Sequence, residues 1–305
     1  MQKDTVIVIG GPTASGKTAL SIELAKKING EIVSSDSMQI YKEMNIGTAK
    51  PDEEEKQGIK HYLIDFISPS ERYSVADYKR DAKKAIREII QKGKVPIVVG
   101  GTGLYIDSLI YEIDYPEIEI DLEYRKSLEE RANKEGLHAL YEEAKKIDEE
   151  AIKKISENDK KRILRILEIY HQTGKTKTDL EKESRKEPEY DYKVFAIDMD
   201  RQILYDRIDK RVDIMIEKGL IKEVEDIYNK YNEFPTSMQA LGYKEVVEYL
   251  QGKINKDEMI EKIKRESRRY AKRQLTWFRK NKQTIWLKGG NENIQENICI
   301  ISQNM

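Results

Sequence analysis

Residues 5–18 run TVIVIGGPTASGKT, a series of β-branched residues that passes directly into a glycine-rich segment. The segment Gly11-Pro12-Thr13-Ala14-Ser15-Gly16-Lys17-Thr18 matches the P-loop pattern at every fixed position. Glycines let such a loop wrap a phosphate with its N–H groups pointing inward, and the following helix adds partial positive charge. We therefore expect a strand, a phosphate-binding loop and a helix, in which Lys17 contacts the outer phosphate and the Thr18 hydroxyl binds Mg²⁺.

Further along the chain, short β-branched runs continue to alternate with helical patterns. This alternation predicts an α/β fold, a parallel sheet with helices on both faces, as in P-loop NTPases. Ser74 and Asp77 have the spacing of a capping box at a helix start. Strands are expected at residues 5–9, 31–34, 61–67, 96–99 and 192–197, and helices at 17–28, 74–91, 201–218 and 257–282.

The composition changes near residue 112. Residues 112–123 hold six acidic residues and no basic one, and the pattern is then helical to about Glu183. Glycine-rich loops of the kind that end parallel strands do not occur in this stretch. We expect an all-helical subdomain at residues 112–190, inserted into a core domain made of residues 1–111 and 191–305.

Cysteine and histidine usage limits the chemistry. The single Cys299 excludes an internal disulfide, and three scattered histidines without cysteine neighbours provide no zinc site. No stretch approaches the ~20 apolar residues that span a bilayer, so we expect a soluble, cytoplasmic protein with no membrane partner. The net charge is −1, so any nucleic-acid partner must be recognised by a local feature.

Residues 262–282 contain such a feature. They hold ten Lys or Arg residues and one acid, Glu266, interleaved with Tyr270, Trp277 and Phe278. Cations neutralise phosphates and aromatic rings stack on unpaired bases, so this helix predicts an RNA-binding surface. A smaller basic group, residues 160–162 with Arg165, lies in the expected insertion.

The P-loop does not specify which phosphate compound it binds. P-loop proteins that hydrolyse nucleotides carry an aspartate at the end of a second strand, whereas residues 96–99 lead into Gly100-Gly101-Thr102. This absence disfavours an ATPase or a GTPase and leaves a small-molecule kinase open. A second Gly-Lys-Thr, at residues 174–176, lacks the earlier glycine and a preceding strand, and we interpret Gly174 as a helix end.

Five blocks together resemble the tRNA dimethylallyltransferase family, in its short bacterial form, and they cover essentially the whole chain. They are the P-loop, residues 35–41 (SDSMQIY), 47–51 (GTAKP), 100–105 (GGTGLY) and 271–279 (AKRQLTWFR). The resemblance implies transfer of the dimethylallyl group of dimethylallyl diphosphate to N6 of adenosine 37, just 3′ of the tRNA anticodon. It also implies Mg²⁺ as the cofactor, the tRNA anticodon stem-loop as the partner, and a monomeric enzyme.

The resemblance assigns roles to individual residues. Asp36, at the end of a predicted strand, matches the general base, and Lys17 and Arg211 match the groups that stabilise the diphosphate leaving group. Arg207 lies on the same helical face as Arg211 and is a second candidate for the diphosphate. The tRNA-facing positions correspond to Asp36, Ser37, Met38, Gln39, Thr102, Arg125, Lys161, Arg162, Arg165, Gln239, Gly242, Lys244, Lys272, Arg273, Gln274, Trp277 and Arg279.

Other functions compete with this one. A prenyltransferase acting on a free adenine nucleotide would share the P-loop and Asp36, but would not need the basic helix at residues 262–282. A small-molecule kinase is disfavoured by the same helix and by the missing strand-end acid. A non-catalytic RNA-binding module would not need Lys17, Thr18 and Asp36 together.

Overall fold

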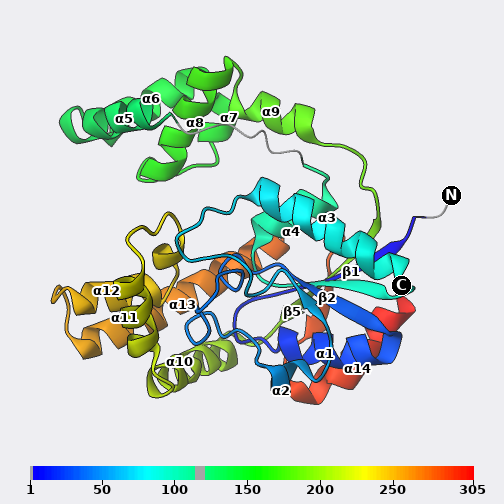
Figure 1. The fold of residues 1–305 in the computed structure, drawn as a ribbon. Coiled ribbons are helices and arrows are strands. Elements are labelled where there is room, and N and C mark those ends of the chain that lie inside the picture. The colour runs from blue at the N-terminus through cyan, green and yellow to red at the C-terminus, as the bar shows by residue number, and fades with distance from the viewer. Residues whose placement is uncertain (1–2, 114–120) are drawn as a thin grey trace. The chain divides into compact units, whose positions relative to one another are not determined.

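The computed structural model describes residues 3–113 and 121–305. The chain divides into two compact units, residues 1–110 with 188–305 and residues 111–187 (Figure 1). Part of the acidic segment expected to open the insertion, residues 114–120, lies outside the described residues.

The larger unit is built on a six-stranded sheet with the order β3-β2-β4-β1-β5-β6, in which every pair is parallel. Helices α1 and α14 cover one face and α3 and α4 the other (Figure 1), so the predicted α/β class is confirmed. The elements are β1 (Thr5–Gly10), α1 (Lys17–Ile28), β2 (Gly30–Ser34), α2 (Glu53–Lys56), β3 (His61–Tyr62), α3 (Val75–Gln91), β4 (Val95–Val99), α4 (Gly103–Ile110), β5 (Asp191–Asp198), β6 (Ile285–Lys288) and α14 (Ile294–Gln303).

The local sequence explains most of these boundaries. Residues 6–9 of β1 are fully buried between the two helical layers, as their continuous β-branched run predicts for a central parallel strand. The capping box at Ser74 and Asp77 is formed, with Ser74 Oγ accepting the Asp77 N–H and the Asp77 carboxylate accepting the Ser74 N–H. The predicted start of α3 is thus confirmed.

Two features at the sheet edges differ from the prediction. The strand expected at residues 61–67 ends after Tyr62, because Leu63 and Asp65 both have a φ of 58°, which breaks an extended chain. At the other edge, β6 and the following α14 were not predicted. The four residues of β6 alternate in exposure and carry too short a pattern to be distinguished from a loop.

Four helices of the larger unit pack around a second apolar core. They are α10 (Arg201–Glu217), α11 (Leu220–Lys230), α12 (Tyr243–Leu250) and α13 (Lys256–Phe278), with a short 3₁₀ turn, η1, at Ser237–Gln239 before α12. Val212, Val224, Tyr243 and Ile263 meet the buried Tyr41 of the loop after β2 in this core. None of the helices within residues 3–113 and 121–305 is long and apolar enough to cross a membrane.

The smaller unit is helical throughout its described residues and has a core of its own. Leu128, Leu140, Ile163 and Leu167 are at its centre. Gly174 ends α8 in the left-handed conformation, with a φ of 66°, which confirms that the second Gly-Lys-Thr is a helix end. The helices are α5 (Leu122–Lys134), α6 (Leu137–Ile147), α7 (Glu149–Ile152), α8 (Lys160–Thr173) and α9 (Lys177–Ser184).

Candidate active site

The P-loop joins the central strand β1 to α1. Gly11 has a φ of 140° and lies against the backbone of Ile197, where a Cβ atom would come within 3.2 Å of its N atom, so a side chain at this position would be strained and crowded. Gly16 caps α1 with a φ of 96°. Ala14 also has a positive φ, 62°, and such a conformation in a non-glycine residue is concentrated at functional sites. The Ser15 hydroxyl is buried and has no hydrogen-bond partner in the structure, although its oxygen can both donate and accept.

Positive charge is concentrated beside this loop. Lys17 Nζ donates to the Pro12 carbonyl oxygen of its own loop at 2.6 Å. Burial, reinforced by the charge of Arg211, lowers the pKa of Lys17 to about 7, and the charge of Asp36 offsets this only in part. Burial likewise lowers the pKa of Arg211, while Asp36 acts in the opposite direction. Two cations held in a poorly solvated place are stabilised by a bound anion, which the diphosphate group would provide.

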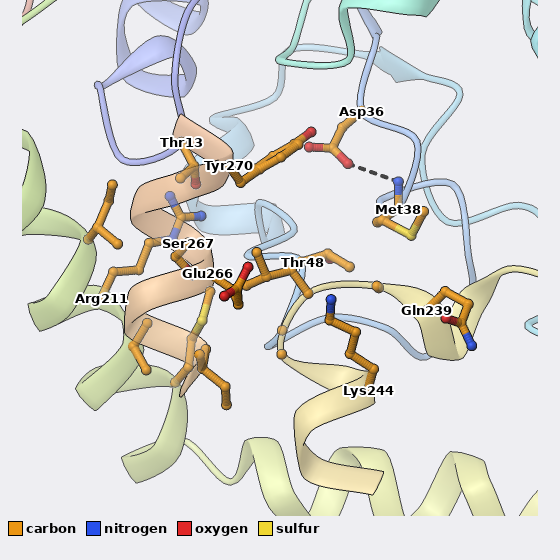
Figure 2. A pocket seen from close by; sticks show the side chains of 18 of the residues that line it. Thr13, Asp36, Met38, Thr48, Arg211, Gln239, Lys244, Glu266, Ser267 and Tyr270 are labelled. Atoms are coloured by element: carbon orange, nitrogen blue, oxygen red, sulfur yellow. Dashed lines mark hydrogen bonds between the residues drawn. The ribbon is translucent and has the colours of Figure 1, made fainter. Parts of the chain in front are cut away.

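Asp36 follows β2 at the carboxyl edge of the sheet, where ligands of open parallel sheets bind. Its Oδ1 accepts the N–H groups of Met38, at 2.9 Å, and Gln39, at 3.3 Å. These bonds form a turn, so the carboxylate position is fixed by backbone contacts. In Figure 2 the Asp36 carboxylate and the Tyr270 hydroxyl point toward one another. Burial, followed by the charge of Asp36, raises the pKa of Tyr270 to about 12.

A network of short side chains ties the loops of this edge together. The Ser37 N–H donates to Thr102 Oγ1 at 3.0 Å. Gln274, on α13, accepts the Thr13 N–H at 2.9 Å and donates to the Gly101 carbonyl oxygen at 3.1 Å. Gln274 is buried, and a Cβ on Gly101 would overlap its amide. Gln274 therefore connects the P-loop to the loop after β4, a role that the assignment of Gln274 to a tRNA contact did not anticipate.

A cavity of about 300 Å³ opens beside these groups, lined entirely by the larger unit. Its walls come from the P-loop, the loops after β2, the segment before α12, and facing sides of α10 and α13 (Figure 2). Polar and apolar residues contribute to the lining, which suits a ligand with a charged and an apolar part. The lining residues are Thr13, Asp36, Ser37, Met38, Gly47, Thr48, Ile208, Arg211, Val212, Met215, Gln239, Ala240, Leu241, Gly242, Lys244, Ile263, Glu266, Ser267, Tyr270 and Arg273.

The structure brings many of the predicted site residues to this cavity, and others lie elsewhere. Of the two arginines on α10, Arg211 lines the cavity and Arg207 does not. Glu266 and Thr48 line it without having been assigned to a site, and Tyr270 lines it although its ring was expected on the RNA-binding surface. Which face of a helix borders a cavity depends on packing between distant segments. The predicted residues that line it are Thr13, Asp36, Ser37, Met38, Arg211, Gln239, Gly242, Lys244 and Arg273; those of the larger unit that do not are Gly11, Pro12, Ala14, Ser15, Gly16, Lys17, Thr18, Gln39, Thr102, Arg207, Lys272, Gln274, Trp277 and Arg279.

The basic helix α13 is less positive at its surface than its composition indicates. Arg268 forms an ion pair with Asp209, and Lys264 pairs with Asp213 at 2.7 Å. Five of the ten cations at residues 262–282 are paired with acids of α10, α12 or α13 in this way, including Lys262, Arg265 and Arg269. Among the described residues, Lys272, Arg273, Lys280 and Lys282 are exposed and show no ion pair.

The aromatic residues of α13 also differ from one another. Phe278 is fully buried against Gly10, so its expected availability to RNA bases is wrong: the ring belongs to the core under the P-loop strand. Trp277 is half-buried and lies on Gly103, where a Cβ would overlap the indole. Tyr270 lines the cavity, and the Arg273 guanidinium lies 5.6 Å from its ring centre.

Four predicted tRNA contacts belong to the smaller unit. Lys161 and Arg162 are exposed in the first turn of α8. Arg165, one turn further, and Arg125, on α5, both form ion pairs with Glu168 of α8.

The strand order corrects one argument from the sequence. Strand β1 lies between β4, which ends without an acid, and β5, which ends in Asp198. Asp198 is thus a carboxylate at the end of a strand beside the P-loop strand. Its Oδ1 accepts the Met199 N–H, and Arg279 Nη2 lies 3.9 Å from it. The strand-end acid whose absence disfavoured a kinase is therefore present, on β5, and a kinase is no longer disfavoured on this ground.

A P-loop beside a cation-lined cavity, with a carboxylate at the cavity wall, provides groups of the kind with which a transferase can bind a phosphorylated donor and accept a proton from a second substrate. The family model described as IPP transferase matches residues 39–281. The chain belongs to this family of prenyl-transferring enzymes, which confirms the resemblance inferred from the sequence blocks.

Individual relatives agree with this assignment. The chain is 54% identical to a tRNA dimethylallyltransferase of Acetivibrio thermocellus, over 93% of this chain and 91% of that protein. Among solved structures, a tRNA isopentenylpyrophosphate transferase of Bacillus halodurans matches with a TM-score of 0.74 and 42% identity, over 99% of this chain and 96% of that one. A eukaryotic dimethylallyltransferase acting on tRNA matches with a TM-score of 0.82 and 32% identity, over 99% and 79% of the two chains.

Proposed function

We propose that this protein is a tRNA dimethylallyltransferase, which moves the dimethylallyl group of dimethylallyl diphosphate to N6 of adenosine 37 in tRNA and releases diphosphate. The observation that carries the proposal is the cavity in which Thr13 of the P-loop, Arg211 and Asp36 meet. Family membership supplies the reaction class, and the geometry accounts for its three requirements, a stabilised leaving group, an apolar place for the prenyl chain and an acceptor for a proton.

The diphosphate leaving group gains negative charge as the bond from carbon to oxygen breaks. Cations and N–H groups placed there stabilise the transition state more than the ground state. Lys17, Arg211 and the P-loop amides provide such groups. The prenyl chain would lie along the apolar part of the lining, where Ile208, Val212 and Met215 of α10 face Ile263 of α13.

The acceptor amine must lose a proton as the new bond from nitrogen to carbon forms. Asp36 is placed to orient the exocyclic amine and to take that proton, since its carboxylate lies at the cavity wall and is fixed by the Met38 and Gln39 N–H groups. The adenosine would have to leave the stack of the anticodon loop to reach it, at a cost of a few kcal/mol.

Mg²⁺ fits this site on the residues present. Among the described residues, no group of three or more acidic, histidine or cysteine side chains could hold a metal ion alone. Mg²⁺ commonly keeps several waters and binds one or two protein groups together with substrate phosphates. The Thr18 hydroxyl, exposed at the start of α1, is suited to this arrangement. The ion would neutralise part of the diphosphate charge.

The tRNA would be bound outside the cavity by cations of both units. Exposed Lys272 on α13, exposed Lys280 in the turn after it, and exposed Lys161 and Arg162 on α8 are suited to phosphates. The nucleobase-facing roles of Trp277, Gln239 and Lys244 are part of this proposal. We expect the enzyme to act in the cytoplasm, where its substrate is found, and as a monomer.

A labelled-donor assay tests the proposal. Purified protein is given Mg²⁺ and dimethylallyl diphosphate labelled in the prenyl group, with unmodified tRNA, with AMP, or with neither. Label should enter tRNA alone and should disappear when adenosine 37 is replaced by guanosine. Label in AMP would indicate the free-nucleotide prenyltransferase instead. Phosphate transfer from ATP to a small acceptor, without prenyl transfer, would indicate a kinase.

A further inference from the structure

Glu168 is a buried acidic residue of the smaller unit, beside two of the arginines that the sequence assigned to tRNA. Its side chain is only 3% exposed, and it lies on α8 one turn after Arg165. The Arg125 guanidinium, which comes from α5, donates to it through Nε at 2.5 Å and Nη2 at 3.0 Å. Arg165 donates through Nη1 at 3.4 Å. One carboxylate thus binds two arginines from two helices.

Both arginines remain accessible while they are bound in this way. Each guanidinium side chain is 35% exposed. A guanidinium has five N–H donors, and Glu168 takes two from Arg125 and one from Arg165, so each arginine keeps at least three donors for another acceptor. Within the described residues, no other acceptor is bound by either guanidinium.

Electrostatics alone does not explain a buried carboxylate at this place. Burying a charge is unfavourable unless its partners are well placed, and an acid beside two cations reduces their attraction for phosphate. The first turn of α8 holds Lys160, Lys161 and Arg162 and no acid, although Asp159 caps it and pairs with Arg162. What Glu168 adds is a fixed orientation of two long side chains, which lowers the entropic cost of donating several hydrogen bonds to one phosphate.

We propose that Glu168 is a positioning residue for tRNA binding, which holds Arg125 and Arg165 side by side so that both donate to the phosphate backbone. This inference rests on the proposed function. It assigns to Glu168 a favourable effect on tRNA affinity, although its own charge repels RNA.

The Glu168→Gln variant tests the proposal through the sign of its effect. The variant removes one negative charge, so a purely electrostatic role predicts tighter tRNA binding. A purely structural role predicts a lower unfolding temperature, with unchanged tRNA binding at temperatures where the variant is folded. Positioning predicts weaker binding, by about fivefold at 0.1 M salt for each phosphate that is no longer bound, and a slope of log K against log salt that is flatter by about 0.7 to 0.9 per phosphate. Binding is measured with the full-length protein and unmodified tRNA, over a series of salt concentrations.

Glu143→Gln is the matched control. Glu143 lies in the same unit and forms an ion pair with Arg131 at 2.6 Å, and neither residue belongs to the proposed tRNA surface. The control removes the same charge and breaks one ion pair with an arginine, so its tRNA affinity should be equal to or higher than that of the wild type. Tighter or unchanged binding by Glu168→Gln as well would overturn the proposal.

Two further measurements separate the explanations. Glu168→Asp keeps the charge and shortens the side chain, so weaker tRNA binding in this variant supports positioning, whereas wild-type binding contradicts it. This variant also serves if Glu168→Gln fails to fold, as thermal unfolding would reveal. Affinity for dimethylallyl diphosphate should stay unchanged in both, since the donor cavity lies in the other unit. Prenyl transfer by the wild-type protein tests the proposed function independently of these comparisons.

Discussion

The Asp36 carboxylate has a structural role beside the proposed chemical one. Oδ1 accepts the Met38 and Gln39 N–H groups and holds the turn after β2, so Asp36 is a turn residue as well as the proposed base. Removing the side chain would remove both roles at once. An asparagine keeps an oxygen that can accept the same two N–H groups but cannot take up the proton.

For this reason, Asp36→Asn is the informative substitution. We expect the rate of single-turnover prenyl transfer to fall by ~10²–10⁴-fold, the usual loss for a general base, with little change in tRNA affinity or thermal stability. Asp36→Ala should show the same rate loss together with weaker binding, because the turn is lost too. Transfer by Asp36→Asn within a few-fold of the wild type would mean that the residue serves only the turn.

Arg211 and Arg207 provide a matched pair on α10, since only Arg211 lines the cavity. We expect Arg211→Ala to weaken donor binding by about tenfold to a hundredfold, because charged hydrogen bonds contribute ~1.5–3 kcal/mol. Arg207→Ala should have a smaller effect, since Arg207 acts on the site through its charge, which helps to lower the pKa of Arg211. Calorimetric titration with dimethylallyl diphosphate measures both. The opposite order would transfer the diphosphate role to Arg207.

At the scale of helices, α13 shows why a count of basic residues overestimates the positive charge that a surface presents to tRNA. Ion pairs with α10 and α12, such as that between Lys264 and Asp213, use part of its positive charge to hold the helix in place. Arg273 lines the cavity, so removing it would disturb two sites. Lys272 and Lys280 are the cleaner probes of the tRNA surface.

We expect Lys272→Ala combined with Lys280→Ala to flatten the salt dependence of tRNA binding by about 1.5 units, roughly 0.7 to 0.9 for each phosphate contact, and to leave donor affinity unchanged. The control combines Lys262→Ala and Lys264→Ala, which removes the same charge from paired positions, and it should flatten the slope less. Equal effects of the two double variants would show that tRNA responds only to the overall charge of the protein.

Elements with strong local signals were predictable, and those that depend on distant neighbours were not. The P-loop, its flanking strand and helix, and the capping box of α3 follow from patterns within about ten residues. The cavity wall joins Thr48, Met215 and Tyr270, more than 220 residues apart at the extremes, and no local pattern says that they meet. Gln274 illustrates the same limit, because its exposed or buried state depends on whether α13 packs over the P-loop.

For the molecule as a whole, the two compact units suggest a division of labour. The larger unit holds the sheet, the P-loop and the complete cavity lining. The smaller unit has its own apolar core, centred on residues such as Leu128 and Ile163, and carries the basic positions of α5 and α8. A unit with its own core can be removed without exposing the core of the other.

We therefore expect the larger unit to fold when residues 111–187 are replaced by a short glycine–serine linker, and to bind dimethylallyl diphosphate as tightly as the full chain. Affinity for tRNA should fall and its salt dependence should flatten by up to about three units, because Arg125, Lys161, Arg162 and Arg165 are removed together. Calorimetry with the donor and salt-dependent tRNA binding provide the two readouts, with circular dichroism to check the fold. If the shortened protein kept the full salt dependence, the smaller unit would not contact the tRNA backbone. If it folded but did not bind the donor, residues 111–187 would be needed to form the cavity, and the proposed division between donor and tRNA binding would be wrong.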